Sequence, residues 1–415
     1  MSLANQSRVV IVGAGHAGGR FALHLRASGF GGPVLVIGQE PELPYERPPL
    51  SKEFLLTNGR DRHAPLAGAK GWAELDVSFA LNAQAVSLRP QNRAVHLSDG
   101  NAVEYDQLVI ATGAAPRELQ VPGGTGPRVF TLRTVADAVT LRAHLSTARR
   151  IAIVGGGVIG LEVAAAARQK GVDVTIIEAG DRVMARIVPP LVSEWIDALH
   201  RAHGVRFYYR TAVRSIESSN TGAVTVMTQT SSGIEDEVPA DFVVVAIGVT
   251  PSSGWLEGSG LPVAQGVTVD AFCRSPADGS CYAVGDVAST WHTRYGRPLR
   301  QETWRNAENQ ARAAAEIMCG RAEPFVETPW MWSDQYDANI QMLGLAEGAE
   351  THILRGNPLA GAFCWIGMRE DIPVGAALIN CSRDRRALEA LVSSGSRVDV
   401  TKLPDRGAPL HRLSA

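Results

Sequence analysis

Two segments of the sequence place three glycines at the spacing G-x-G-x-x-G, which suits the binding of a pyrophosphate. The segments are RVVIVGAGHAGGRFALHLRASG and RIAIVGGGVIGLEVAAAARQKG. The glycines are Gly13, Gly15 and Gly18 in the first segment and Gly155, Gly157 and Gly160 in the second. The first glycine of such a set allows a tight turn, the second lets the backbone approach a phosphate, and the third lets a helix pack closely on a strand. One copy could be only a turn, but two copies predict that the chain binds two dinucleotides.

A carboxylate follows the second glycine set at the separation expected for a ribose contact. The strand VDVTIIE ends at Glu178, where an acidic side chain can accept a hydrogen bond from a ribose 2′-hydroxyl. Because a 2′-phosphate would be repelled there, NADH is expected in preference to NADPH, although Arg182 and Arg186 follow closely and could weaken the preference. The corresponding strand after the first glycine set has a less regular ending, Gln39-Glu40.

Each glycine set must be held between a β-strand and an α-helix, and the surrounding pattern predicts both. A β-branched run precedes each set, and an apolar helical pattern that ends at glycine follows it. The segments YDQLVIATGAAPR and DFVVVAIGVTPSS repeat the order of a strand followed by small residues and glycine, and SCYAVGDVAST places Asp286 just after an apolar strand. Asp286 is a candidate site residue, although it could instead cap the next helix.

The gross properties of the chain argue against several classes of protein. A length of 415 residues suggests two or three domains. The net charge of -2 argues against nucleic acid as the main partner. No apolar run approaches the length of a membrane span, and the first residues lack a basic-then-apolar pattern, so we expect neither a membrane span nor a secretory leader. The five cysteines include no C-x-x-C pair, so we expect reduced thiols in a cytoplasmic protein, with neither a metal cluster nor a disulfide framework.

Together these features resemble the flavoproteins with two dinucleotide-binding domains, within the pyridine nucleotide-disulfide oxidoreductase superfamily. The resemblance covers nearly the whole chain. It implies an α/β fold like that of glutathione reductase, in which two Rossmann-like domains bind FAD and NADH and a smaller α+β domain follows. The implied domains are a discontinuous FAD-binding domain of residues 1–115 and 246–325, an NAD-binding domain of residues 116–245, and a C-terminal domain of residues 326–415.

The stretch PYERPPLSKE, residues 44–53, is informative for the cysteine that it lacks. Its three prolines restrict the backbone, so a side chain that it presents stays in place. In disulfide reductases of the superfamily this region carries a redox-active cysteine pair beside the flavin, and in NADH oxidases and peroxidases it carries one cysteine. The first cysteine of the present chain is Cys273. The resemblance therefore implies that electrons leave the flavin directly, without passing through thiols.

Five motifs narrow the resemblance to the NADH-dependent ferredoxin reductases of bacterial oxygenase systems, a group that includes putidaredoxin reductase and the reductases of aromatic-ring dioxygenases. The motifs are RPPLSK (47–52), LRT (131–133), VGDVA (284–288), ETWRNAENQA (302–311) and WSDQYD (332–337). The resemblance implies catalytic roles for Lys52 near the reactive end of the flavin, Trp304 against the isoalloxazine, and Glu162 near the nicotinamide, where it can pair with Lys52. The implied FAD contacts are Gly13, Gly15, His16, Ala17, Gly18, Gln39, Glu40, Arg47, Lys52, Ala85, Ala111, Thr112, Gly113, Arg133, Asp286 and Trp304. The implied NAD contacts are Gly155, Gly157, Val158, Ile159, Gly160, Glu162, Glu178 and Gly248.

Each of these roles has a simpler alternative. Lys52 could be an ordinary solvated lysine, Trp304 could belong to the core, and Glu162 could be placed by the helix dipole alone. The motif WSDQYD could be only the joint of the third domain. Related reductases often have aspartate where Gln39 stands, so either Gln39 or Glu40 could hold the FAD ribose.

Three classes of function are compatible with the sequence. The first is an FAD-dependent NADH:ferredoxin reductase, which passes electrons to a [2Fe–2S] ferredoxin or a rubredoxin that feeds an oxygenase. The others are a flavoenzyme that reduces a small molecule such as monodehydroascorbate, a quinone or oxygen, and a non-enzymatic NADH sensor like apoptosis-inducing factor. Because such ferredoxins are usually acidic, the first class predicts a basic docking surface. The candidate residues, which could also form an ordinary solvated face, are Arg294, Arg297, Arg300, Arg305 and Arg312.

Overall fold

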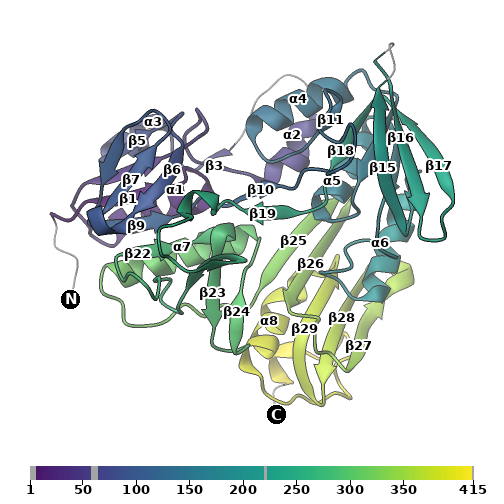
Figure 1. Ribbon diagram of the computed structural model, residues 1–415. Helices are drawn as coiled ribbons and strands as arrows, with labels where there is room; N and C mark the ends of the chain where they lie inside the picture. The colour runs from purple at the N-terminus through teal and green to yellow at the C-terminus, as the bar shows by residue number, and fades with distance from the viewer. Residues whose placement is uncertain (1–5, 58–63, 219–221, 414–415) are drawn as a thin grey trace. The chain divides into compact units, whose positions relative to one another are not determined.

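The computed structural model describes residues 6–57, 64–218 and 222–413 (Figure 1). Packing divides the chain into two compact units. The described residues of the first unit fall within Met1–Arg47, His63–Ala115 and Val249–Glu327, and those of the second fall within Pro48–Arg62, Pro116–Gly248 and Thr328–Ala415. The finer division into FAD-binding, NAD-binding and C-terminal domains stays a prediction.

The first unit is built around a parallel sheet with the strand order β22-β9-β1-β2-β5. Its strands are β1 (Val9–Val12), β2 (Val34–Ile37), β5 (Val77–Ala80), β9 (Gln107–Ile110) and β22 (Cys281–Ala283). Strand β1 has the sequence VVIV and all four residues are buried, as expected for a parallel strand that is covered on both faces. Helices α1 (His16–Ala27) and α7 (Trp304–Met318) pack together and contribute Phe21 and Ala311 to the same core as β1 (Figure 1).

Smaller elements complete the first unit. They include the three-stranded sheet β6-β7-β8, the four-stranded sheet β20-β21-β23-β24, and several short strands and helical turns. They are β3 (Tyr45–Glu46), β4 (Ala64–Pro65), α3 (Ala69–Glu74), β6 (Ala85–Arg89), η2 (Pro90–Asn92), β7 (Ala94–Leu97), β8 (Ala102–Glu104), β10 (Ala114–Pro116), β19 (Val249–Pro251), η3 (Gly254–Leu256), β20 (Val263–Ala264), β21 (Gly266–Val269), η4 (Gly285–Val287), β23 (Ala288–His292) and β24 (Arg297–Leu299).

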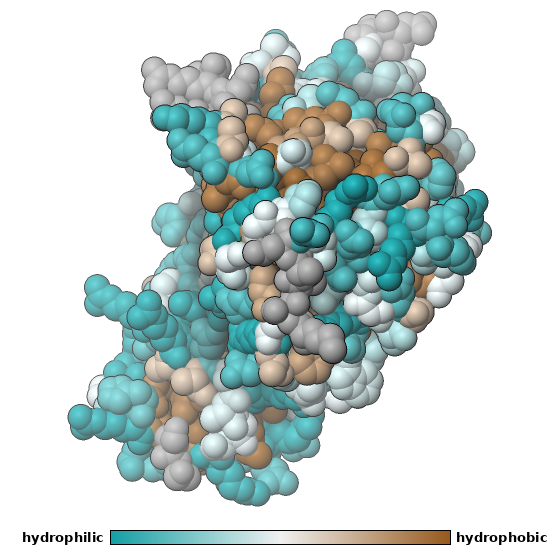
Figure 2. All heavy atoms as spheres, turned by 90° about the vertical axis from the view of Figure 1, so that its left-hand side faces the viewer, coloured by the Kyte–Doolittle hydropathy of each residue, from teal (hydrophilic) through white to brown (hydrophobic). Residues whose placement is uncertain are grey.

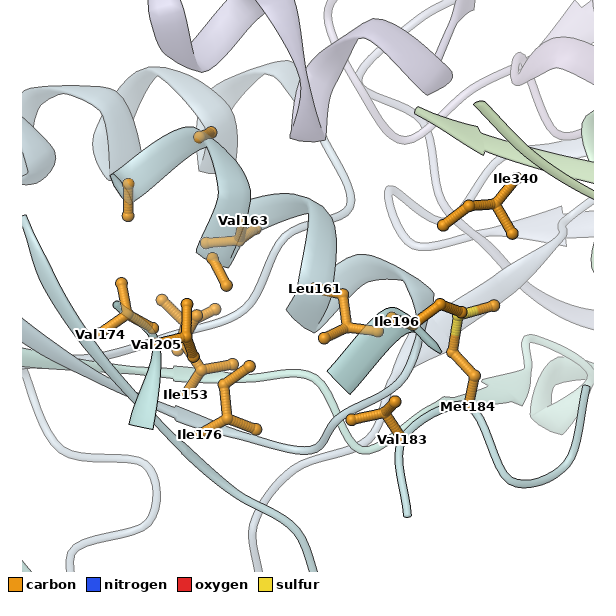
Figure 3. Packing of buried hydrophobic residues seen from close by; sticks show 14 of the residues in the cluster. Ile153, Leu161, Val163, Val174, Ile176, Val183, Met184, Ile196, Val205 and Ile340 are labelled. Carbon is orange, nitrogen blue, oxygen red and sulfur yellow. The ribbon is translucent and has the colours of Figure 1, made fainter. Parts of the chain in front are cut away.

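The second unit contains another parallel sheet, with the order β11-β18-β12-β13-β14. Its strands are β11 (Val129–Phe130), β12 (Arg150–Val154), β13 (Asp173–Ile177), β14 (Arg206–Tyr208) and β18 (Phe242–Val245). Helix α5 (Val158–Gln169) is rich in alanine, the best helix former. Figure 3 shows its Leu161 and Val163 packed with Ile153 of β12 and Ile176 of β13. This packing fixes the rotation of α5 and hence the direction of Glu162, which lies between the two apolar residues.

An antiparallel sheet forms the C-terminal part of the second unit, with the order β25-β26-β29-β28-β27. Its strands are β25 (Trp330–Gln335), β26 (Ala338–Gly344), β27 (Thr351–Asn357), β28 (Ala362–Arg369) and β29 (Ile372–Ile379). One face of the sheet contributes Ile340 to the core shown in Figure 3. The other face packs against α8 (Arg385–Ser394), which supplies Leu388 and Leu391 to a separate core.

The remaining elements of the second unit are short helices and a three-stranded antiparallel sheet. They are η1 (Pro48–Ser51), α2 (Glu53–Leu56), α4 (Val135–Leu145), α6 (Pro190–Ala202), β15 (Thr211–Ser218), β16 (Val224–Thr230), β17 (Glu235–Ala240), η5 (Pro358–Ala360), η6 (Ser382–Asp384) and η7 (Leu410–Arg412). Two parallel sheets with helices, followed by an antiparallel sheet with a helix, confirm the predicted fold class.

The surface is mixed in polarity. On the face shown in Figure 2, hydrophilic side chains cover much of the surface and hydrophobic residues gather in separate areas. Within the described ranges no helix combines the length and the apolar character needed to cross a bilayer.

Candidate functional site

The first glycine loop has the geometry that an anion-binding turn requires. Gly13 has a φ of +119°, and a Cβ at this position would lie 2.2 Å from the carbonyl oxygen of Ala111. A Cβ at Gly18 would lie 1.9 Å from the carbonyl oxygen of Gly13. At Gly15 the space is open, because a Cβ there would meet only Arg47 Nη2, at 3.6 Å. The three glycines thus fill the turn, approach and packing roles that the sequence predicts.

Helix α1 starts immediately after this loop with its first-turn N–H groups directed at the turn. Its N-cap is Gly15, which provides no side-chain hydrogen bond to the helix. The first N–H groups of a helix have no partner within it, and they attract anions together with the helix dipole. The loop and helix therefore fit a dinucleotide pyrophosphate.

At the end of β2, the two candidate ribose ligands differ in their surroundings. The side chain of Gln39 is exposed. The Glu40 carboxylate receives a hydrogen bond from Arg47 Nη2 at 2.6 Å and another from the hydroxyl group of Tyr45. Arg47 also donates to the Tyr45 hydroxyl at 3.2 Å. Glu40 and Arg47 therefore form an ion pair, whereas Gln39 is open to solvent. Whether Gln39 or Glu40 holds the FAD ribose stays a prediction.

The other expected FAD contacts of the first unit lie after β9, in α1, at the start of β6 and in η4. Ala111, Thr112 and Gly113 follow β9, and the Thr112 hydroxyl donates to the carbonyl of Ser252 at 2.7 Å. Ala17 lies in α1 and Ala85 begins β6. Asp286 lies within the 3-10 turn η4 and does not cap a following helix, since β23 comes next.

Trp304 is the first residue of α7, and its ring centroid lies 5.3 Å from that of His16. It is only half-buried, so it is not simply a core residue. The sequence analysis missed Gln310 on the same helix, which is 1% exposed. Its side-chain oxygen accepts from the backbone N–H of Gly285 at 2.8 Å, and its amide donates to Thr290 Oγ1 at 2.6 Å. Gln310 thus attaches to α7 the turn that contains Asp286. Its position within the ETWRNAENQA motif was the one sequence feature that could have pointed to this role.

A charged cluster joins α1 and α7 and was also missed. Glu308 Oε2 lies 2.9 Å from His16 Nε2 and 2.6 Å from Arg20 Nε, and Glu308 Oε1 lies 3.5 Å from His24 Nε2. Although burial opposes ionisation, the hydrogen bonds from His16 and His24 and the charge of Arg20 lower the pKa of Glu308 to about 2. The cluster orients the His16 ring at the first turn of α1.

The second glycine loop repeats the geometry of the first within the second unit. Gly155 has a φ of +105°, and a Cβ there would lie 2.5 Å from the carbonyl oxygen of Ala246. A Cβ at Gly160 would lie 2.2 Å from the Gly155 carbonyl oxygen, whereas at Gly157 the nearest atom is 3.9 Å away. Helix α5 begins at Val158 with Gly157 as its N-cap and without a side-chain cap. This loop also fits a pyrophosphate.

Glu178 lies at the end of β13 and is tied to this loop. Its Oε2 accepts from the backbone N–H of Gly156 at 2.7 Å, and its Oε1 accepts from that of Gly180 at 2.6 Å. The carboxylate is therefore held beside the glycine turn, where a ribose hydroxyl can reach it. Arg182 donates to two backbone carbonyls at 2.8 Å, those of Val188 and Ala185, so its guanidinium is already engaged.

Two further expected NAD contacts lie in the first turn of α5 and just after β18. The side chain of Ile159 in the first turn of α5 is 41% exposed, which is unusual for isoleucine and leaves it open to a ligand. Gly248 has a φ of +101°, and a Cβ there would lie 3.3 Å from Arg186 Nη2. Arg186 is thus near Gly248 and is exposed.

The proline-rich stretch presents Lys52 to Glu162 in the second unit. Pro48–Ser51 form the turn η1, and Lys52 Nζ lies 2.8 Å from Glu162 Oε1. The side chain of Lys52 is 15% exposed and that of Glu162 is 2% exposed. Lys52 is therefore not an ordinary solvated lysine. Glu162 lies past the first turn of α5, in which there is no acidic residue, so the dipole alternative was wrong and specific contacts hold this carboxylate.

Two serines complete the surroundings of Glu162. The Ser51 hydroxyl donates to Oε2, and the Ser333 hydroxyl donates to Oε1 at 2.6 Å. Ser333 belongs to β25 and to the WSDQYD motif, so this motif is more than the joint of a domain. Lys52 Nζ also lies 6.0 Å from the ring centroid of Trp332. The functions of Lys52 and Glu162 stay predictions, but their pairing is part of the structure.

A chain of buried hydrogen bonds continues from Ser333 and was not expected from the sequence. Gln335 Nε2 donates to Ser333 Oγ at 3.0 Å, and Gln335 Oε1 lies 2.9 Å from His200 Nε2. The Tyr336 hydroxyl lies 3.3 Å from His200 Nδ1. Burial lowers the pKa of His200 to about 4, against the hydrogen bond with Gln335, so the ring is neutral at pH 7.

The arginines near Trp304 are less available than their sequence spacing suggested. Arg305 is paired with Glu327, and Arg300 Nη1 lies 2.5 Å from Glu302 Oε1. The fold brings Glu327 next to α7, and Glu302 lies two positions after Arg300, so both arginines are already paired with acidic residues. Arg297 and Arg312 are exposed, and Arg294 is half-buried.

Comparison with known proteins identifies the family. Residues 7–311 match the model of the pyridine nucleotide-disulphide oxidoreductases, and residues 330–414 match the reductase C-terminal model. The ferredoxin–NAD(+) reductase component of the anthranilate 1,2-dioxygenase system of Burkholderia cepacia is 41% identical, over 95% of this chain and 96% of the relative. Rhodocoxin reductase of Rhodococcus erythropolis is 38% identical, over 93% of this chain and 89% of the relative.

Solved structures agree with these matches. The ferredoxin reductase for the CYP199A2 system of Rhodopseudomonas palustris superimposes with a TM-score of 0.94 and 33% identity, covering 99% of this chain and 100% of that one. The covalent putidaredoxin reductase–putidaredoxin complex gives a TM-score of 0.91 and 32% identity, with 97% of each chain covered. With both glycine loops, Glu178 and the C-terminal sheet in place, the chain belongs to the pyridine nucleotide-disulphide oxidoreductase family.

Proposed function

We propose that this chain is an FAD-dependent NADH:ferredoxin reductase, which passes electrons from NADH through FAD to a [2Fe–2S] ferredoxin or a rubredoxin that feeds an oxygenase. The names of the relatives at 38–41% identity, which are reductase components of oxygenase systems, support this function. Two glycine loops that each fit a pyrophosphate support the use of two dinucleotides. The relatives match over 95–98% of this chain.

One observation favours direct transfer to a protein carrier over thiol chemistry. The proline-rich stretch carries no cysteine. It presents Lys52 instead, which is paired with Glu162 of α5. Cys273 and Cys281, the first two cysteines of the chain, are buried in the cores of the first unit. Burial raises the pKa of each thiol to about 12, so neither is a thiolate at pH 7.

The residues of the chain have separate tasks in this proposal. A bound FAD would supply the capacity to take two electrons from NADH and to give them up singly, which suits a one-electron iron–sulfur acceptor. The first glycine loop, Glu40 and Arg47 would hold FAD, and the second loop with Glu178 would hold the adenosine half of NADH. The paired Lys52 and Glu162 would orient the reacting groups and exclude water from them. The neutral His200 network behind Ser333 would keep Glu162 in place.

The location and the division into domains are also proposals. We infer that the protein works in the cytoplasm, which is supported by the five cysteines, all of which are free in the structure. We further infer that residues 1–115 and 246–325 form the FAD-binding domain, 116–245 the NAD-binding domain and 326–415 the C-terminal domain. The first family model ends its match at residue 311 and the second begins at residue 330, which supports the boundary between the FAD-binding and C-terminal domains.

Two matched substitutions test which loop holds which cofactor. At both Gly15 and Gly157 a Cβ meets no atom closer than 3.6 Å, so valine there should obstruct a phosphate rather than the turn itself. Gly15→Val should purify without FAD. Gly157→Val should keep FAD, released as FAD and not FMN on denaturation, but should lose reduction by NADH. Gly68→Ala serves as the control, because nothing lies within 4 Å of a Cβ at that exposed position.

Turnover with different acceptors tests the function itself. With NADH, the FAD-loaded enzyme should reduce an acidic [2Fe–2S] ferredoxin much faster than it reduces oxygen. The ferredoxin rate is measured through the reduction of cytochrome c by the reduced ferredoxin. The rate with ferredoxin should fall as salt is raised, whereas the rate with a neutral quinone should not. Failure to reduce any ferredoxin or rubredoxin, together with rapid reduction of a quinone, would replace the proposal with the small-molecule reductase.

A further inference from the structure

Two cysteines and an aspartate meet in the core of the C-terminal sheet, away from the residues assigned above. The Sγ atoms of Cys364 and Cys381 and a carboxylate oxygen of Asp384 all lie within 4.8 Å of one another. Cys364 Sγ is 3.9 Å from Asp384 Oδ2. Cys364 is completely buried, Cys381 is 5% exposed, and the Asp384 side chain is 26% exposed. The two sulfur atoms are thus close together, with one of them nearer to solvent.

The local fold brings the pair together across a turn. Cys364 of β28 is the register partner of Leu378 in β29, and both belong to the core beneath α8. Strand β29 ends at Ile379, and Asn380 has a φ of +52°, a conformation that asparagine adopts more readily than most residues. The chain therefore turns over the sheet, so that Cys381 enters the same core as Cys364.

A buried arginine and the Asp384 carboxylate both lie next to the pair. Arg355 is 3% exposed, and its Nε lies 3.5 Å from Asp384 Oδ2. Its other nitrogens donate to the backbone carbonyls of Leu403, Asp405, Arg406 and Ala408. A hydrogen bond from Cys364, together with the charge of Arg406 and against the effect of burial, lowers the pKa of Cys381 to about 7. The same hydrogen bond and burial raise the pKa of Cys364. Cys381, which is also the nearer of the two to solvent, is therefore the better nucleophile of the pair.

We propose that Cys364 and Cys381 form a redox-active dithiol, which a hydroperoxide converts into an intramolecular disulfide. The thiolate of Cys381 attacks an oxygen of hydrogen peroxide, the O–O bond breaks, and the departing hydroxide takes up a proton and leaves as water. The sulfur of Cys364 then displaces the hydroxyl group from the resulting sulfenic acid, which forms the S–S bond and releases a second water. Two thiols are oxidised and one peroxide is reduced to two waters.

A divalent cation is the competing occupant of this cluster. Two thiolates and a carboxylate are suitable zinc ligands. The guanidinium of Arg355, however, already lies next to Asp384, where a cation would be repelled by it. The same charge stabilises a single thiolate, so the electrostatics favour the dithiol.

Peptide mapping of the FAD-loaded, full-length enzyme tests the proposal. The enzyme is reduced, freed of reductant, treated with hydrogen peroxide and then alkylated under denaturing conditions. We expect a cross-linked pair of peptides that contain Cys364 and Cys381, about 2 Da lighter than the two reduced peptides together. Cys319 is the internal reference, because it is more exposed than either cysteine but burial raises its pKa. Oxidation of Cys319 without the cross-link would overturn the proposal.

Three variants separate the chemistry from effects on folding. Cys364→Ala should leave Cys381 as a sulfenic acid that dimedone traps, without a cross-link. Arg406→Gln should slow formation of the cross-link at pH 7 by several-fold, since a thiol with an ordinary pKa of about 8.5 is only about 3% ionised at that pH. Arg412→Gln, at another exposed position in the same segment, should react like the wild type.

Zinc provides the opposing result. If one equivalent of Zn²⁺ binds to the reduced enzyme and protects both Cys364 and Cys381 from alkylation and from peroxide, the cluster is a metal site and the dithiol proposal fails. No arm of this experiment uses turnover with NADH, so its outcome is independent of the proposed reductase activity.

Discussion

Replacing Glu162 by glutamine isolates the charge of the Lys52–Glu162 pair. The Glu162 carboxylate accepts hydrogen bonds from Ser51 and Ser333 and contacts Lys52 at 2.8 Å. In Glu162→Gln the amide oxygen can still face Lys52 and Ser333. Its NH₂ group would then face Ser51, whose hydroxyl can turn and accept a hydrogen bond. The shape of the site is therefore retained and only the charge is lost.

The cost follows from the burial of the two partners. Breaking a buried ion pair by removing one partner costs about 3–5 kcal/mol, because the other charge is left unpaired. In Glu162→Gln the remaining charge is that of Lys52, which is 15% exposed and partly solvated, so we expect the free energy of unfolding to fall by about 2–3 kcal/mol. In Lys52→Met the remaining charge is the almost fully buried carboxylate, so we expect a loss of about 3–5 kcal/mol.

Urea unfolding of the FAD-loaded variants, followed by tryptophan fluorescence, measures these losses. The double variant Lys52→Met/Glu162→Gln should lose less stability than the sum of the single variants, because neither charge remains unpaired. Ser333→Ala is the reference for loss of one hydrogen bond to the carboxylate and should cost about 1.5–3 kcal/mol. If the two single variants are as stable as the wild type, or if their losses simply add, the ion pair does not stabilise the fold as argued.

Three further predictions concern the cofactor, the pH and the docking surface. Because Glu178 is held at the second glycine loop, kcat/KM for NADH should exceed that for NADPH by at least about tenfold, which corresponds to about 1.4 kcal/mol, and Glu178→Gln should reduce the ratio. Burial lowers the pKa of His200 from 6.5 to about 4, so the unfolded chain binds this proton before the folded protein does as the pH falls below 6.5. The free energy of unfolding should therefore drop by about 2 kcal/mol between pH 7 and pH 5. Urea unfolding of His200→Gln at the two pH values should lack this drop. Arg297→Glu and Arg312→Glu should slow reduction of an acidic ferredoxin and flatten the salt dependence of that rate, while leaving dye reduction unchanged. Arg369 is also exposed but lies in the C-terminal sheet, so Arg369→Glu should behave like the wild type. Equal effects of all three substitutions would place docking elsewhere.

The structure also shows which charges are unsuitable for such tests. Arg305 is paired with Glu327, so its reversal would leave that carboxylate without its partner as well as change the surface. Arg355 is buried and holds the C-terminal segment through backbone carbonyls, so its reversal would disturb folding and cannot serve as a surface control. Neither fact is visible in the sequence, because the partners lie more than 20 residues away in both cases.

The sequence by itself determined the features that depend on neighbouring residues. Both glycine loops, the strands and helices around them and the position of Glu178 at a strand end follow from local rules of turn geometry, periodicity and spacing. The missing cysteine in the proline-rich stretch is likewise a local fact. Because a G-x-G-x-x-G turn needs only its own strand and helix, its geometry could be predicted without knowledge of the rest of the fold.

Only the tertiary structure decided the features that join distant segments. Glu162 meets Lys52 from 110 positions earlier and Ser333 from 171 positions later, and His200 reaches the same network through Gln335. Cys364 and Cys381 come together because Asn380 turns the chain over the sheet. Such contacts are set by how sheets and helices pack, and packing depends on shape complementarity between whole elements, which no local pattern of residues encodes.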